Sequence, residues 1–184
     1  MYTGNNPTAL RSMEWLLKAF NELLETNDYA SITIKEVCQK ADLSRQTFYQ
    51  LFNSKEELVT YQCEDFFAGY MDELLKKNTA PDDLDKIVFL FFDYARKYKK
   101  LIRLLVDNNF SYVITEKWYS FLQEINELKF QELSSYQNQY LYWFISGAVS
   151  QILLQWFQND MDLSTKEISK LTLELIKGKY FQLS

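Results

Sequence analysis

The chain has no histidine, only two cysteines, four glycines and two prolines among its 184 residues. Without histidine it lacks the commonest general base and the commonest metal ligand of proteins. Cys38 and Cys63 are too few for a disulfide framework, and we expect each to be a small buried hydrophobe in a reducing compartment. No Gly-rich phosphate loop, CxxC pair or GxSxG motif occurs. The sequence therefore offers no catalytic, metal-binding or cofactor-binding residue and argues against an enzyme.

The scarcity of glycine and proline predicts few turns and long helices. The composition is 47% hydrophobic and 17% aromatic, which is ample to bury a core. No alternating polar and apolar run bounded by Gly-rich turns indicates a strand. The expected fold class is all-α, with about nine helices in one compact domain or two small ones that share a core.

One long uncharged stretch, residues 133–159, raises the question of a membrane span. A spanning helix needs about 20 mostly apolar residues. Here Ser146, Ser150, Gln151 and Gln155 interrupt the run. A helix covered by its own chain and by a second subunit explains the same pattern, and no signal segment precedes it. We therefore expect a cytoplasmic protein without a membrane partner, and a membrane-associated helical protein is the weaker alternative.

Net charge is −5, which argues mildly against a nucleic-acid partner. The acidic excess is unevenly placed, however. Residues 1–55 hold six basic and six acidic side chains, whereas all of the excess lies in residues 56–184. Within residues 33–55 four basic side chains stand against two acidic ones. This is a weak basic footprint and would not by itself indicate DNA.

Helix-start signals divide the N-terminal part of the chain. Thr33 and Glu36 form a capping box, in which each side chain satisfies the other residue's backbone N–H. Ser44 is a second N-cap, and Ser54 with Glu57 is a second capping box that opens a long helix. The short helix after Ser44, over about residues 44–50, contributes little to a core. The pattern predicts a helix-turn-helix whose second helix is presented to a partner.

Apolar spacing of three and four residues predicts the remaining helices. One helix precedes the helix-turn-helix, from Pro7 to about Asn27. After a break near Pro81 further helices are expected over about residues 84–95, 101–106, 110–128 and 135–159. A third capping box, Ser164 with Glu167, opens the last helix.

The short helix has the residues to read a DNA major groove, which admits one α-helix. Arginine pairs with guanine and glutamine with adenine, and both types stand in its first turn. Other side chains are placed to meet the sugar-phosphate backbone, including a lysine at the start of the following helix, where N–H groups already favour phosphate. The candidate contacts from this reasoning are Thr33, Lys35, Arg45, Gln46, Thr47, Tyr49, Gln50 and Lys55. They may equally be read as the solvated surface of a short polar helix.

The segment ITIKEVCQKADLSRQTFYQLFNSKEEL, residues 32–58, closely resembles the N-terminal signature of the TetR family of bacterial transcription regulators. The resemblance implies an all-helical homodimer with an N-terminal DNA-binding domain, residues 1–53, and a ligand-binding and dimerisation domain, residues 54–184. Its usual DNA contacts fall on the residues above and on Ser44. Asp42 stands where the family favours glycine, and aspartate is among the residues that best tolerate positive φ.

Two further sets of residues are predicted in the C-terminal part. Aromatic side chains could form a core or the walls of a pocket for a small apolar or aromatic effector; they are Phe66, Phe67, Tyr70, Phe89, Phe92, Phe110, Tyr112, Trp118, Phe121 and Trp143. Residues 144–168 resemble the dimerisation end of many family members. The dimer interface expected from that resemblance comprises Ser146, Gly147, Ser150, Gln151, Leu154, Ile168, Leu171 and Leu175, which may instead be core within one chain.

These observations predict a DNA-binding transcription regulator, a repressor that responds to a small molecule and binds a pseudo-palindromic operator as a homodimer. One rival is a regulator that has lost its small-molecule response and acts through a protein partner, for instance as an activator. The size of any pocket discriminates between the two, because a filled core favours the rival. A helical enzyme or a membrane-associated protein is the more distant alternative.

Overall fold

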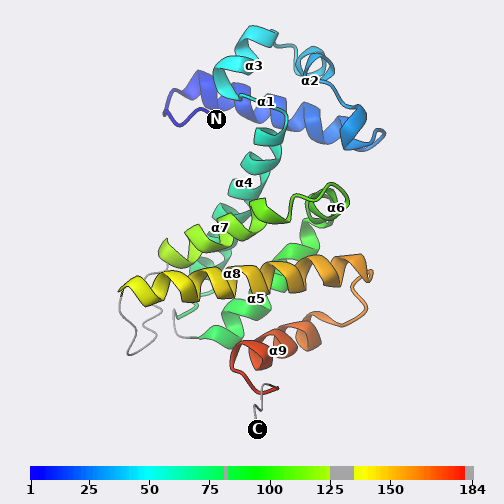
Figure 1. The fold of residues 1–184 in the computed structure, drawn as a ribbon. Coiled ribbons are helices and arrows are strands. Elements are labelled where there is room, and N and C mark those ends of the chain that lie inside the picture. The colour runs from blue at the N-terminus through cyan, green and yellow to red at the C-terminus, as the bar shows by residue number, and fades with distance from the viewer. Residues whose placement is uncertain (81–82, 125–134, 181–184) are drawn as a thin grey trace. The chain divides into compact units, whose positions relative to one another are not determined.

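The structure is a computed structural model that describes residues 1–80, 83–124 and 135–180 (Figure 1). Within these ranges the chain forms nine α-helices and one short 3₁₀ turn, and no strand. The expectation of an all-α fold is therefore confirmed. Packing divides the chain into two units, Met1–Gln62 and Cys63–Ser184, which we call the N-terminal and C-terminal units. Helix α4 (Glu56–Lys76) begins in the first unit and ends in the second.

The N-terminal unit contains α1 (Pro7–Leu23), the 3₁₀ turn η1 (Tyr29–Ser31), α2 (Ile34–Lys40) and α3 (Arg45–Leu51). Each α-helix begins where a side chain accepts a backbone N–H: Asn6 caps α1, Thr33 caps α2 and Ser44 caps α3. Apolar side chains from all three helices are buried in a small common core; they include Leu16, Phe20, Val37, Phe48 and Phe52.

Two helix ends in this unit differ in chemistry. Asp42, in the turn between α2 and α3, has φ +54°, so aspartate does adopt the left-handed conformation expected there. The sequence suggested the same conformation for Asn27 at the end of α1. Instead its side-chain Nδ2 donates to the Leu23 carbonyl at 2.9 Å. The amide side chain thus satisfies a carbonyl that the end of the helix leaves unpaired.

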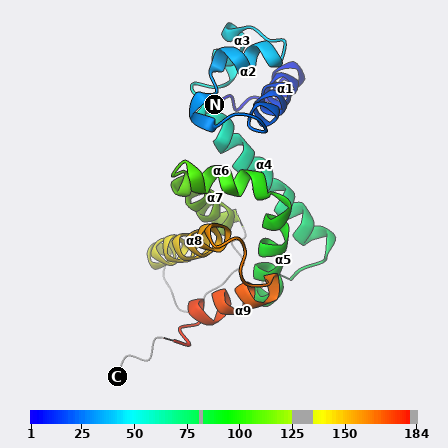
Figure 2. The same cartoon turned by 90° about the vertical axis from the view of Figure 1, so that its right-hand side faces the viewer.

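The C-terminal unit contains the rest of α4 and five further helices, α5 (Leu84–Lys97), α6 (Lys99–Asp107), α7 (Ser111–Glu124), α8 (Ser135–Gln158) and α9 (Thr165–Ile176). Helix α8 packs along α7, and α9 packs against α5 (Figures 1 and 2). The capping box at Ser164 opens α9 as expected. Of the other sequence expectations, Pro81 and the final residues of the 110–128 stripe, Ile125 and Leu128, lie outside the described residues.

An aromatic cluster fills the core of the C-terminal unit. Phe67 and Tyr70 of α4 pack against Phe91 of α5, and Trp118 of α7 lies 4.5 Å from Phe91 between ring centroids. Gly69 of α4 faces Tyr94 of α5, and a Cβ at Gly69 would collide with the Tyr94 hydroxyl. That residue is therefore glycine because two helices approach closely, and it needs no special backbone angle.

Candidate nucleic-acid interface and effector pocket

Helix α3 separates its side chains cleanly between core and solvent. Phe48 and Leu51 are buried, whereas Arg45, Gln46, Tyr49 and Gln50 are exposed, and Tyr49 keeps 50% of its surface. Residues three and four apart share one face of a helix, so the four exposed side chains form one polar face. We call it the α3 face. It carries hydrogen-bond donors and acceptors of the types that pair with base edges.

The N-cap hydroxyls of α2 and α3 are committed to the protein. Ser44 Oγ accepts the Thr47 backbone N–H at 2.9 Å and lies 2.9 Å from the Thr47 hydroxyl. Thr33 Oγ1 donates to Glu36 Oε2 at 2.7 Å, and the Thr33 backbone N–H donates to the same oxygen at 2.8 Å. These bonds hold the pKa of Glu36 below its ordinary value. The exposed residues Thr33 and Ser44 thus have a structural role beside any contact with DNA.

Lys55 has a role that sequence reasoning missed. Its ammonium donates to the carbonyl oxygens of Tyr29 at 2.5 Å and Ile32 at 2.6 Å, and lies 4.1 Å from the centroid of the Tyr29 ring. Burial lowers its pKa, against the opposing influence of the Glu56 and Glu36 carboxylates. Two of its three N–H donors therefore tie the segment before α2 to the start of α4. One donor is left for a phosphate.

The structure brings the predicted DNA contacts to two neighbouring places. Thr33 and Lys35 stand exposed at the start of α2, and the α3 face adjoins them through the turn at Asp42. Thr47 is half-buried, as is Lys55 at the threshold of α4. The arrangement is a helix-turn-helix whose second helix presents a polar face, which is the element that enters a major groove.

Two family models match this chain. The model of bacterial regulatory proteins of the tetR family matches residues 16–61, and a transcriptional regulator C-terminal region of the TetR type matches residues 82–178, more than half of the chain. The chain belongs to the TetR family. The family is one of transcriptional regulators and not of enzymes.

Relatives and solved structures agree with this assignment. The dhaKLM operon transcriptional activator DhaS of Lactococcus lactis is 27% identical over 125 residues, 66% of this chain and 64% of its own, so the match spans less than two thirds of that relative. A solved dihydroxyacetone kinase operon activator DhaS has TM-score 0.60 at 22% identity, over 92% of this chain and 96% of its own. Thermus thermophilus FadR, a repressor solved with lauroyl-CoA, has TM-score 0.65 at 16% identity, over 89% and 92%.

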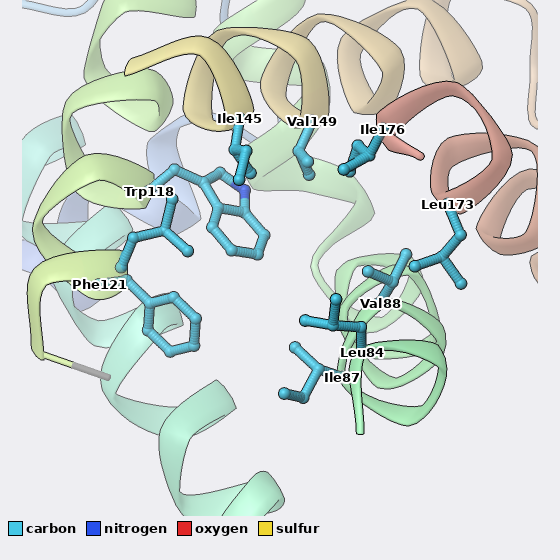
Figure 3. A pocket seen from close by; sticks show the side chains of 10 residues that line it. Leu84, Ile87, Val88, Trp118, Phe121, Ile145, Val149, Leu173 and Ile176 are labelled. Carbon is cyan, nitrogen blue, oxygen red and sulfur yellow. The ribbon is translucent and has the colours of Figure 1, made fainter. Parts of the chain in front are cut away.

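The C-terminal unit of this TetR-family chain encloses an apolar cavity of about 40 Å³ between α5, α7, α8 and α9 (Figure 3). Side chains from all four helices line it: Leu84, Ile87, Val88, Trp118, Phe121, Leu122, Ile145, Val149, Leu173 and Ile176. Two of the ten aromatic residues predicted as pocket walls, Trp118 and Phe121, are among them. Five others are buried outside this lining, namely Phe66, Phe67, Tyr70, Phe92 and Phe110.

The remaining three predicted pocket residues lie at the surface. Phe89, Tyr112 and Trp143 keep 40%, 52% and 46% of their surface, and Trp143 stacks on Tyr119 with ring centroids 4.3 Å apart. Trp143 faces outward because the small residues of α8, Ser146 among them, turn toward the core. Ser146 is fully buried and donates to the Tyr142 carbonyl at 2.5 Å.

The predicted dimer residues are likewise divided. The chain itself buries Ser146, Ser150, Leu154 and Ile168, leaves Gly147, Leu171 and Leu175 half-buried, and exposes Gln151. The side of α8 that the chain leaves uncovered carries large aromatic residues instead. We call this side the α8 outer face; its members are Tyr140, Trp143, Phe144, Gly147 and Gln151.

Other chemistry expected or questioned from the sequence can be placed. Both cysteines are buried, and burial raises the pKa of the Cys63 thiol to about 12, as expected for an unreactive hydrophobic residue. In the described part of the chain no group of three or more Cys, Asp or Glu side chains is arranged to hold a metal ion. Over the same residues, no helix combines the length and the hydropathy required to cross a bilayer.

Proposed function

We propose that this TetR-family protein is a ligand-responsive repressor that binds a pseudo-palindromic operator as a homodimer in the cytoplasm. The observation that carries the proposal is the α3 face, on which Arg45, Gln46, Tyr49 and Gln50 are all exposed beside Lys35. The proposed division of labour follows the predicted domains: residues 1–53 bind DNA, and residues 54–184 bind the effector and the second subunit.

A dimer is needed because a palindromic operator presents two half-sites. Two recognition helices read such a site when they stand about 34–36 Å apart, one turn of DNA. The α8 outer face supports this assembly. Phe144 keeps 58% of its surface and Gly147 has nothing within 4 Å of an added Cβ, so a second helix could approach closely there.

The cavity supports the effector response through its link to α4. Trp118, which lines the cavity, also packs against Phe67 and Tyr70 of α4, with ring centroids 5.6 and 6.3 Å away. Helix α4 begins in the unit that carries the α3 face. A ligand that displaces Trp118 would therefore act on the helix that leads to the DNA-binding unit, and so favour one separation of the recognition helices over another.

A second candidate function is a regulator that acts through a protein partner without a small molecule. Two observations favour it. The cavity is small, because aromatic rings fill most of the C-terminal core. A relative of this chain, DhaS, is an operon activator by its name. Binding of a partner protein, and not of a ligand, would then change the affinity for DNA.

Fluorescence anisotropy with labelled DNA tests the proposal. The DNA is the segment just upstream of the protein's own gene, and a scrambled duplex of equal length is the control. Specific binding is expected to weaken with salt, with a log–log slope of about −0.9 for each phosphate neutralised. Affinity equal to that for the scrambled duplex, at every salt concentration, would contradict a self-acting repressor.

A further inference from the structure

Trp118 carries a buried hydrogen-bond donor without a partner. The side chain is 3% exposed, and no described residue accepts a hydrogen bond from its Nε1. The indole nitrogen is a donor only, and the great majority of buried polar side-chain atoms are paired. Trp156 shows the usual arrangement in the same unit, because its Nε1 donates to the Leu163 carbonyl at 2.9 Å.

The unpaired donor belongs to the wall of the cavity. Trp118 is the only one of the ten lining residues whose side chain has a polar atom, since the other nine are leucine, isoleucine, valine and phenylalanine. Figure 3 shows the nitrogen on the edge of the indole next to Ile145. A bound water needs two to four polar partners. These side chains supply one, so water is a poor occupant of this space.

Packing fixes the direction of the donor. The indole is held by Phe67 of α4, Phe91 of α5 and Phe121 of its own helix, with ring centroids 5.6, 4.5 and 5.2 Å away. A ring wedged between three others does not rotate to seek another acceptor. The N–H is therefore pre-organised to meet a group that enters the cavity.

We propose that the cavity takes a compact, uncharged ligand with a hydrocarbon body and one hydrogen-bond acceptor, such as a carbonyl oxygen, and that Trp118 Nε1 donates to it. The apolar lining excludes a charge, which would lose its water without a partner. The donor discriminates against pure hydrocarbons, which leave it unsatisfied. This inference rests on the ligand-responsive function proposed above, and it names the chemistry of the effector.

Two probes of equal shape test the inference. Cyclopentanone and methylenecyclopentane differ in that C=O replaces C=CH₂, so only the ketone has a strong acceptor. Dissociation constants for both are measured by NMR on the full chain carrying ¹⁵N-tryptophan, and on Trp118→Phe, which removes the donor and keeps an aromatic ring. Trp156→Phe is the matched control, because its N–H is already paired.

The ratio of the two dissociation constants is the decisive quantity, since it cancels any general loss of packing. We expect Trp118→Phe to shift this ratio roughly tenfold toward the alkene, equivalent to about 1.4 kcal/mol, and Trp156→Phe to leave it unchanged. The ketone, and not the alkene, should move the Trp118 indole ¹H resonance downfield. If Trp118→Phe does not fold, this shift in the unmodified protein decides the question alone.

Two results would overturn the inference, and each says something different about the proposed function. Binding of both probes with the same ratio in all three proteins would refute the acceptor but retain a ligand pocket. No response of the indole resonances to millimolar amounts of either probe would refute the cavity as a ligand site. Operator binding, measured separately by anisotropy, would stand or fall independently of both.

Discussion

Replacing Lys55 by methionine should destabilise the N-terminal unit, because methionine keeps the apolar stem and removes the ammonium. Hydrogen bonds to a charged group contribute about 1.5–3 kcal/mol each, so the two bonds to Tyr29 and Ile32 give about 3–6 kcal/mol. The desolvation that lowers the pKa of Lys55 opposes this gain. Allowing for that opposition, we expect a net loss of about 2–4 kcal/mol in the free energy of unfolding.

Urea denaturation followed by circular dichroism, together with amide exchange in α2 and α3, measures that loss. Lys35→Met is the matched control, because Lys35 is exposed at the start of α2. The control should keep its stability within about 0.5 kcal/mol and reduce the salt slope of operator binding by about 0.9. An unchanged urea midpoint and unchanged exchange in Lys55→Met would refute the structural role of this lysine.

Three further predictions concern other parts of the chain. Arg45→Ala should weaken operator binding by about 1–3 kcal/mol and relax the preference at one base pair, as measured by anisotropy with single-base variants of the operator. Gly69→Ala should lower stability by about 1–3 kcal/mol, and adding Tyr94→Phe should restore most of it in urea unfolding, because the hydroxyl that the new Cβ meets is gone. Phe144→Arg should shift sedimentation from dimer to monomer, whereas Trp15→Arg, also at an exposed aromatic but on α1, should not.

Local chemistry explains why most helix starts could be predicted. The capping boxes at Thr33 and Ser164 are formed as expected, because their hydrogen bonds join residues three positions apart and need no tertiary contact. Asp42 was recognisable for the same reason, since its positive φ is a property of one residue in one turn. The division of α3 into buried and exposed residues follows from helical spacing alone.

Lys55 shows where such reasoning stops. Its partners are backbone carbonyls 26 and 23 residues earlier in the chain, and every residue type has the same carbonyl. No pattern of side chains can therefore announce the contact. A lysine at a helix start is expected to meet a phosphate, and only the tertiary structure shows that two of its donors are already used.

The orientation of α8 is a matter of packing that spacing leaves open. The helix is uncharged throughout, so its sequence does not mark a wet side. Small residues, Ser146 and Ser150, and large ones, Trp143 and Phe144, lie on different sides, and either side could face a neighbour. The structure buries the small residues against the same chain, which places the aromatic side outward. The interface expected from Gly147 and Gln151 extends, in consequence, over Phe144.

The position of the cavity follows from a change in side-chain shape. Aromatic rings of α4, α5 and α7 satisfy one another edge to face, and such pairs leave little space between them. Beyond Trp118 and Phe121 the lining becomes leucine, isoleucine and valine from α5, α8 and α9. Short aliphatic side chains facing across four helices do not reach far enough to fill the centre. The sequence signal for a pocket is therefore the end of the aromatic cluster and not the cluster itself, and it leaves the last indole with its N–H unpaired.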